Sequence, residues 1–222
     1  MLNLDAHPRG SFSESPLVLG LQVSLWRLVA GFWLSLLIGA PLGLLLWRSK
    51  LIDDAFGPFL LGLQTLPSVC WAPLAVLSLG LDYRAVLFVT VMGSAFAIAL
   101  SLRDGMRTVP PIYQRAGKML GAHGWKFYAY ILLPASLPAF VSSLRQGFSF
   151  AWRSLMGGEL VLPTPAPMGL GLLLEHGRNL ADVAQVVAVM VVMIVMGMLV
   201  DRLILAQVEK WIHTRFGLTQ VH

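Results

Sequence analysis

The chain has 222 residues, of which 57% are hydrophobic and 12% are charged, and its mean hydropathy is +0.74. This balance excludes an ordinary soluble domain and predicts a protein embedded in a lipid bilayer. The net charge is +5, but the basic residues fall in short segments between apolar runs, which favours membrane topology over nucleic-acid binding.

The first segment, residues 1–16, is polar and lacks the short apolar core of a cleaved signal peptide. Five later stretches are long and apolar enough to cross a bilayer, and all are expected to be helices because a lipid environment leaves no backbone group unpaired. They are residues 23–47, 59–79, 85–102, 139–162 and 183–205. We therefore predict an all-α, polytopic membrane protein with about five transmembrane helices in one domain over residues 17–210, followed by a tail over 211–222.

Prolines interrupt two of these stretches. Pro41, flanked by Gly39 and Gly43, lies in the first, while Pro67 and Pro73 lie in the second. Each proline removes a backbone donor and invites a kink, which would let a helix bend around a pathway. The alternative is that Gly and Pro are simply common in membrane helices. The sequence has no internal repeat, so twofold symmetry would require a second copy of the chain.

The distribution of Lys and Arg predicts which side each loop occupies. Cytoplasmic loops carry an excess of these residues. If the segment 113–134 is cytoplasmic, three basic residues lie outside, and ten lie inside: Arg48, Lys50, Arg103, Arg107, Arg115, Lys118, Lys126, Arg202, Lys210 and Arg215. The three outside are Arg9, Arg84 and Arg178. This bias predicts an external N-terminus and a cytoplasmic C-terminus.

The segment 113–134 is cationic and punctuated by glycine. Pro110 and Pro111 favour a helix start near Ile112, and Gly121 would end that helix before a second short one. Two short amphipathic helices at an angle make a compact knob that could sit in a groove of a partner, with basic residues at its rim. The alternative is an interfacial segment that lies on anionic lipid.

Polar residues share one face of the fourth predicted span. At about 100° per residue, the helix brings together Ser142, Gln146, Ser149, Arg153 and Gly157. A polar face inside a membrane should look toward an aqueous pathway or a subunit interface, since an unpaired cation there costs roughly 2.5–3.5 kcal/mol.

The charged residues within the spans each have two interpretations. Arg153 could hold a sulfonate, nitrate or carboxylate through its guanidinium group, or it could pair with Glu159 or cap carbonyls of a broken helix. Arg145 lies about one turn inside the cytoplasmic boundary, where its side chain can snorkel to the headgroups or to the segment 113–134. Arg27 lies in the outer part of the first span, where it needs a partner or water or could equally be a snorkelling anchor. Glu159 is either part of an external gate or an interfacial carboxylate.

The sequence lacks the residues for catalysis. No Gly-x4-Gly-Lys-[Ser/Thr] phosphate loop occurs, and no nucleophile, base or carboxylate pair shares a membrane depth. The histidines all lie outside the predicted spans: His7, His123, His176, His213 and His222. We predict no enzyme activity and no bound cofactor, so any ATP would be bound by another chain. An autonomous secondary carrier or channel is the alternative function.

The spacing RAG-x3-G-x9-I-x-LP, from Arg115 to Pro134, closely resembles the EAA loop of ATP-binding-cassette (ABC) importer permeases, EAA-x3-G-x9-I-x-LP. The stretches SLWRLVAGFWLSLLIGAPLGLLL, QTLPSVCWAPL and RQGFSFAWRSLMGGEL, with the GLG at 169–171, are similar to the nitrate, taurine and aliphatic-sulfonate branch of that family. The resemblance extends from Ser24 to Trp211.

This resemblance implies a type I importer permease in the bacterial inner membrane. Such a permease forms a homodimer, joins two copies of an ABC ATP-binding subunit, and receives its solute from an external solute-binding protein. The solute would be a small anion such as a sulfonate, taurine, nitrate or bicarbonate. The pathway would involve Ser142, Gln146, Ser149, Arg153 and Glu159.

The resemblance also implies that the segment 113–134 couples the ATPase to the spans. The residues that match the motif are Arg115, Ala116, Gly117, Gly121, Ala122, Ile131, Leu133 and Pro134. Two positions depart from the family pattern, because Arg115 replaces its acidic residue and Gly117 its second alanine. A salt bridge from that acidic residue to the ATPase therefore does not carry over.

Overall fold

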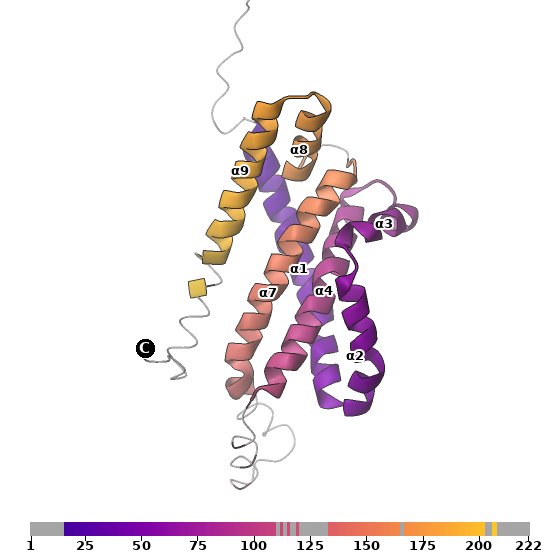
Figure 1. Ribbon diagram of the computed structural model, residues 1–222, viewed down its shortest axis with the longest axis vertical. Coiled ribbons are helices and arrows are strands. Elements are labelled where there is room, and N and C mark those ends of the chain that lie inside the picture. The colour runs from indigo at the N-terminus through magenta and orange to yellow at the C-terminus, as the bar shows by residue number, and fades with distance from the viewer. Residues whose placement is uncertain are drawn as a thin grey trace, which may run out of the picture.

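The computed structural model describes residues 16–109, 133–164, 167–202 and 206–207, together with positions 112, 115 and 119. Within these residues all regular structure is helical (Figure 1). The helices are α1 (Pro16–Arg48), α2 (Lys50–Thr65), the short 3₁₀ helix η2 (Ser68–Trp71), α3 (Ala72–Leu79), α4 (Tyr83–Arg107), α7 (Leu133–Val161), α8 (Leu170–Asn179) and α9 (Val183–Val200). The predicted all-α fold is confirmed.

The long helices run side by side, so the molecule has two distinct ends (Figure 1). At the loop end, α1 finishes, α2 begins, α4 finishes at Arg107 and α7 begins at Leu133. At the α8 end lie the short helix α8, the start of α9 and the start of α4. The segment 113–134 thus follows α4 at the loop end.

Helix α4 is the central element, and it packs closely against both α1 and α7. Small residues make this possible. A Cβ atom on Gly39 would lie 2.5 Å from the carbonyl oxygen of Ala95, and one on Gly43 would lie 2.5 Å from that of Ala99. In the contact between α4 and α7, Gly147 of α7 leaves room for the side chain of Ile98 of α4. Close backbone approach through small residues is how membrane helices gain packing energy without a hydrophobic driving force.

Among the described residues, three helices are long and apolar enough to cross a membrane: α1, α4 and α9. The predicted second span is instead two pieces, because α2 and the η2–α3 segment meet at an angle of 99°. The predicted fourth span corresponds to α7, which has 29 residues and would extend over about 43 Å. Its serines, Arg145, Gln146 and Arg153 lower its hydropathy. The prediction of five simple spans is therefore only roughly right.

The prolines behave differently from one another. Pro41 lies inside α1, which continues unbroken to Arg48, so the predicted interruption there is wrong. Pro67 does lie in a break, because α2 ends at Thr65 and the next helical turn starts at Ser68. Pro73 falls in the first turn of α3, where a missing backbone donor costs nothing. The packing of α1 against α4 suits the difference, since α1 stays helical through Pro41 where it contacts α4.

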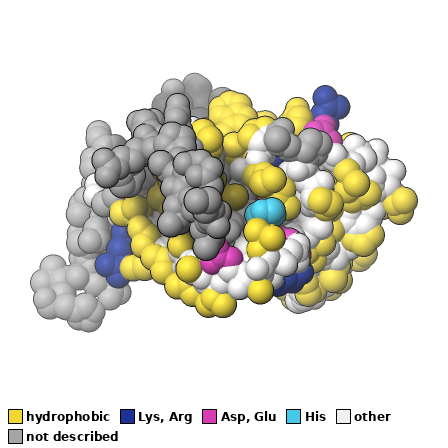
Figure 2. Space-filling view, turned by 90° about the horizontal axis from the view of Figure 1, so that it is seen from above, with side chains coloured by type: hydrophobic (Ala, Val, Ile, Leu, Met, Phe, Trp, Pro, Cys, Tyr) yellow, Lys and Arg dark blue, Asp and Glu magenta, His cyan; other side chains and the backbone are white. Residues whose placement is uncertain are grey.

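The α8 end exposes many hydrophobic side chains and only scattered charged ones over its described part (Figure 2). Helix α9 is the least buried of the long helices, with 6% of its apolar window covered by the chain. Val189 is its one buried residue among those described. The exposed apolar surface of α9 suits contact with lipid rather than water.

We predict that Gly43→Leu destabilises the helix bundle by roughly 1–3 kcal/mol, because a side chain at this position would overlap the Ala99 carbonyl group. The measurement is the apparent melting temperature of the purified protein in mild detergent. Gly62→Leu is the matched control, since a Cβ there meets no atom within 4 Å. Equal melting temperatures for the two variants would contradict the close α1–α4 contact.

Candidate functional site

A buried ion pair joins α1 to α7 near the α8 end. Arg27 Nη1 donates to Glu159 Oε1 over 2.9 Å, and the two residues are 5% and 1% exposed. The second arm of the guanidinium, Nη2, donates to the Pro167 carbonyl over 3.2 Å and to Thr164 Oγ1 over 3.4 Å. A buried charge persists only when it is paired and hydrogen-bonded. This pair meets both conditions.

The same carboxylate also holds the start of α8. Glu159 Oε2 accepts from Ser24 Oγ at 2.7 Å and from the Gly171 backbone N–H at 3.1 Å, while Ser24 Oγ accepts from the Leu170 N–H at 2.8 Å. A Cβ on Gly169 would lie 2.2 Å from Glu159 Oε1. Glycine therefore lets the helix N-terminus close onto the carboxylate, whose negative charge it stabilises.

This arrangement corrects three sequence predictions. Arg27 does not snorkel, since it is buried and paired. Glu159 is not an interfacial carboxylate, because it is 1% exposed. Arg153 does not pair with Glu159, whose cation partner is Arg27. The sequence gives no signal for this pairing, because residues 27 and 159 are far apart along the chain.

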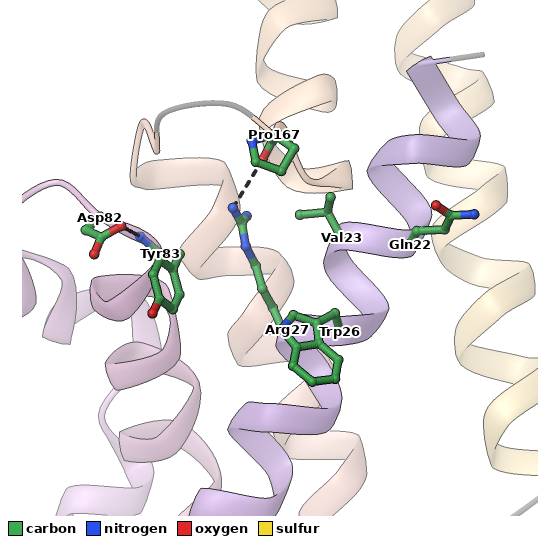
Figure 3. Close-up of a pocket in the computed structure, with 7 residues that line it drawn as sticks. All are labelled: Gln22, Val23, Trp26, Arg27, Asp82, Tyr83 and Pro167. Carbon is green, nitrogen blue, oxygen red and sulfur yellow. Dashed lines mark hydrogen bonds between the residues drawn. The ribbon is translucent and has the colours of Figure 1, made fainter. Parts of the chain in front are cut away.

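A pocket of about 460 Å³ lies beside this pair, between α1 and the start of α4 (Figure 3). Its walls include Trp26, Tyr83 and Asp82, and the side chain of Arg27 extends along it toward Pro167. The guanidinium charge is already neutralised by Glu159, so the pocket offers no free cation to an anionic ligand.

The polar face of α7 lies exposed on the described chain. Ser142, Gln146, Ser149 and Arg153 are all exposed, and Gly157 continues the same face. Arg153 Nε donates to the Ser149 carbonyl of its own helix over 3.3 Å, and its guanidinium carbon lies 4.6 Å from the centroid of the Phe150 ring. Among the described residues, Arg153 has no carboxylate partner. Within the same described part of the chain, Arg153 donates to a carbonyl of the unbroken helix α7 and to none of the carbonyls at the break between α2 and η2, so it does not cap a broken helix.

At the loop end this face opens onto a pocket of about 490 Å³ between α2, α4 and α7. Ser101 Oγ of α4 donates to Gln146 Oε1 over 2.7 Å within it. The polar or charged residues that line it are Gln64, Ser101, Arg103, Asp104, Thr108, Ser142, Ser143 and Gln146. A polar pocket thus lies at the loop end of the polar face.

The break between α2 and η2 lies against α7 and α4, beside the polar face of α7. Leu66, Pro67 and Cys70 are exposed. A methyl group of Val69 lies 3.0 Å from the position of a Cβ on Gly157, and Ser68 approaches Gly93 of α4 in the same way. The break is therefore placed about one helical turn from Arg153 on α7.

Two further ion-pair groups lie toward the loop end. Asp53 of α2 accepts from Arg103 at 3.0 Å and from Arg107 at 2.5 Å. Arg145 of α7 forms a two-pronged pair with Asp201, with both distances 2.9 Å. Asp201 lies just beyond the α9 span, and the hydrogen bond from Arg145 holds its pKa below the usual value. The predicted snorkelling of Arg145 is replaced by this pair, which is ionised at neutral pH.

Comparison with known proteins decides the family. A sequence model described as "Binding-protein-dependent transport system inner membrane component" matches residues 32–213. The chain belongs to this family. The match covers the predicted spans from the middle of α1 to beyond α9, and it includes the segment 113–134.

Named relatives of this permease are ABC transporter permeases. A putative one from Methanocaldococcus jannaschii is 27% identical over 203 residues, which cover 91% of this chain and 75% of that protein. The nitrate import permease NrtB of Synechocystis is 27% identical over 188 residues, with 84% and 67% covered. The bicarbonate permease CmpB of Synechocystis is 26% identical over 179 residues, with 81% and 63% covered. These relatives are membrane transport components, and the chain is an ABC importer permease.

The fold is also known from a solved structure. The inward-facing MetNI methionine ABC transporter contains a chain that matches with a TM-score of 0.77 and 18% identity, over 91% of this permease and 99% of that chain. At this identity the match establishes the fold alone. It agrees with the predicted type I importer permease fold.

Most of the predicted coupling residues of the permease lie outside the described residues: Ala116, Gly117, Gly121, Ala122 and Ile131. Arg115 is described, and it is exposed. Leu133 and Pro134 form the first turn of α7. Within the described residues, no group of three His, Cys, Asp or Glu side chains is placed to hold a metal ion.

The sequence did not point to Asp53, or to the hydrogen bonds that Ser24 makes with Glu159 and with the start of α8. Asp53 follows the helix-capping Ser49 at the start of a helix, which is an ordinary place for an acidic residue. Its partners lie 50 and 54 residues later, so only the fold reveals them. The GLG at 169–171 was the sequence feature that indicated the contact between the start of α8 and Glu159.

We predict that Glu159→Ala lowers the stability of the permease by roughly 3–5 kcal/mol, since it leaves the Arg27 cation buried and unpaired. The double variant Arg27→Met/Glu159→Leu should lose clearly less. The readout is the apparent melting temperature in detergent. Glu175→Ala, which breaks the exposed Glu175–Arg178 pair at the same end, is the control and should change stability by about 1 kcal/mol or less. A double variant as unstable as Glu159→Ala would count against the pairing.

Proposed function

We propose that this permease carries a small anion, such as nitrate, bicarbonate, taurine or a sulfonate, along the polar face of α7. Arg153 is the observation that carries this proposal. Arg27 and Arg145 each have a carboxylate partner, whereas Arg153 is exposed and has none among the described residues. A cation kept within a membrane helix at this cost needs an anionic or aqueous partner.

The relatives support an anionic solute. Two of them are named as permeases for nitrate and for bicarbonate, both small anions. A guanidinium group suits both, because its parallel N–H donors match the planar oxygen pair of such ions. Ser142, Gln146 and Ser149 continue the face toward the loop end, where hydroxyl and amide groups can replace solute hydration. Glu159 is withdrawn from this pathway, since it is buried against Arg27.

The pathway would run between two copies of the permease. The residues of the α2–η2 break, Leu66 and Pro67, are exposed beside the polar face, and irregular backbone at membrane depth is stable only beside protein or water. A second copy that faces the same surface would cover the break and leave an aqueous channel along α7. This arrangement supplies the twofold symmetry that the sequence of one chain lacks.

The loop end would face the cytoplasm of a bacterial cell and the N-terminus would lie outside. Arg48, Lys50, Arg103 and Arg107 gather at the loop end, while the described face at the α8 end has few basic groups (Figure 2). The segment 113–134 would then contact an ATP-binding subunit, one for each permease copy. An external solute-binding protein would deliver the anion to the α8 end, and ATP would bind only to the partner subunits.

In this mechanism the ATP-binding subunits close when they bind ATP, and the segment 113–134 follows them. The helices then alternate between access from the inside and from the outside. Arg153 would hold the anion during the change through charge-assisted hydrogen bonds. Family membership favours this coupled import over an autonomous carrier or channel.

We predict that Arg153→Gln lowers anion uptake roughly 10-fold or more, because a hydrogen bond to a charged group contributes about 1.5–3 kcal/mol. Arg153→Lys should retain part of the activity. The assay is uptake of labelled nitrate, bicarbonate and taurine by proteoliposomes that contain the permease, its ATP-binding subunit and its binding protein. Arg178→Gln, an exposed arginine in an ion pair, is the control. Unchanged uptake of every anion by Arg153→Gln would remove this residue from the pathway.

We predict that Gly121→Trp uncouples ATP hydrolysis from transport, since a bulky side chain would disturb a knob seated in the ATP-binding subunit. Basal hydrolysis should persist while stimulation by the loaded binding protein falls at least 5-fold. Ile112→Trp, at an exposed position before the motif, serves as the control. Normal stimulation and uptake by the Gly121 variant would overturn the coupling role of the segment 113–134.

A further inference from the structure

A compact group of charges, which we call the Asp53 clamp, joins α2 to the end of α4. It consists of Asp53, Arg103 and Arg107. The Asp53 carboxylate is 7% exposed and uses both oxygens, with Arg103 Nη1 on Oδ1 at 3.0 Å and Arg107 Nη2 on Oδ2 at 2.5 Å. The two arginines are four residues apart, so they lie on the same face of α4. One acidic group thus holds two cations of a neighbouring helix.

The local sequence is fitted to this contact. Ser49 caps the start of α2, because its Oγ accepts from the Ile52 N–H over 3.4 Å. Gly57 lies one turn after Asp53, and a Cβ there would come within 2.9 Å of Arg103 Nη1 and 3.0 Å of Asp53 Oδ1. A larger residue would push the guanidinium away. Arg103 is further held by Asp104, whose Oδ1 accepts from Nε at 2.7 Å.

The clamp lies between two features that the proposed function uses. Helix α4 ends at Arg107, six residues before the segment 113–134 begins. Helix α2 leads from Asp53 to the break at residues 66–67, and it has 16 residues, which makes it about 24 Å long. Leu60 of α2 packs with Leu46 of α1 and Leu100 of α4, and this contact holds the middle of α2 against those two helices. Helix α2 therefore connects the end of α4, just before the segment 113–134, with the break beside Arg153.

We propose that Asp53 is a positioning residue that makes α2 move together with the end of α4, from which the segment 113–134 follows. Asp53 would thus transmit motion of that segment to the break beside the anion pathway. This inference rests on the proposed coupling role of the segment. A carboxylate suits the task, because it both attracts the two guanidinium groups and cancels their mutual repulsion. Asparagine has nearly the same size but cannot neutralise either cation.

The test uses the complete transporter, with permease, ATP-binding subunit and binding protein reconstituted in proteoliposomes. The measured quantity is the number of labelled anions imported per ATP hydrolysed. We expect Asp53→Asn to lower this ratio at least 5-fold while assembly with the ATP-binding subunit and basal hydrolysis stay within 2-fold of the wild type. Asp54→Asn is the matched control, because Asp54 is the exposed neighbour and forms no ion pair with a described residue. It should leave the ratio unchanged.

A second variant separates transmission from folding. Arg107 is about half exposed, and Arg107→Gln leaves the Asp53–Arg103 contact in place, so this variant should fold and assemble while the ratio falls 2-fold or more. The double variant Asp53→Asn/Arg107→Gln should match Asp53→Asn, since both changes remove one shared connection.

The outcomes are distinguishable. A wild-type ratio in Asp53→Asn, or in Arg107→Gln if Asp53→Asn fails to assemble, would overturn this inference while the proposed function stands. Normal coupling in the Gly121→Trp variant would instead overturn the proposed coupling role of the segment 113–134, on which this inference rests. A fall of the ratio in Asp54→Asn equal to that in Asp53→Asn would also overturn the assignment to Asp53.

Discussion

A bilayer has no water to solvate a charge or an unpaired backbone group, and this constraint organises the permease. Each charge deep within the described helices is accounted for by a partner, with one exception. Arg27 is neutralised by Glu159, Asp53 by Arg103 and Arg107, and Arg145 by Asp201. Arg153 is the exception, because the described residues offer it a carbonyl of its own helix and an aromatic ring but no carboxylate.

The paired charges also tie helices together at both ends of the bundle. The Glu159 carboxylate joins α1, α7 and the start of α8, and the Asp53 carboxylate joins α2 to α4. Between them the helices pack through glycine, alanine and larger apolar side chains, and a hydrogen bond between the Ser35 and Ser94 hydroxyls joins α1 to α4.

The sequence predicted the helices well and their connections poorly. Apolar runs located four of the five predicted spans on helices, because length and hydropathy are local properties. The outcome at prolines was not local: Pro41 lies in an unbroken helix packed on α4, while Pro67 lies in a break of 99°. Likewise Arg27 and Arg145 were expected to reach the headgroups, since their partners at 159 and 201 become neighbours only in the folded chain.

The polar face of α7 was predictable because its residues recur with the helical period, and the structure leaves that face uncovered. The match of the segment 113–134 to a family motif was predictable for a different reason, since it depends on fixed spacing within one short stretch. Glu159 could not be placed in the same way. Whether a carboxylate lines a channel or is sealed inside the bundle depends on the glycines at 169 and 171.

Helix α9 shows how little is needed to fix the rotation of a membrane helix. A cylinder that is apolar on every side can turn about its axis in lipid with almost no change in energy. Near its start, the Gln185 amide donates to the Leu173 carbonyl over 3.1 Å, and just past its end Asp201 meets Arg145. These polar contacts at the two ends, together with the packing of Val189 on α8 and of Gly197 beside Trp152, set the rotation of α9 about its axis.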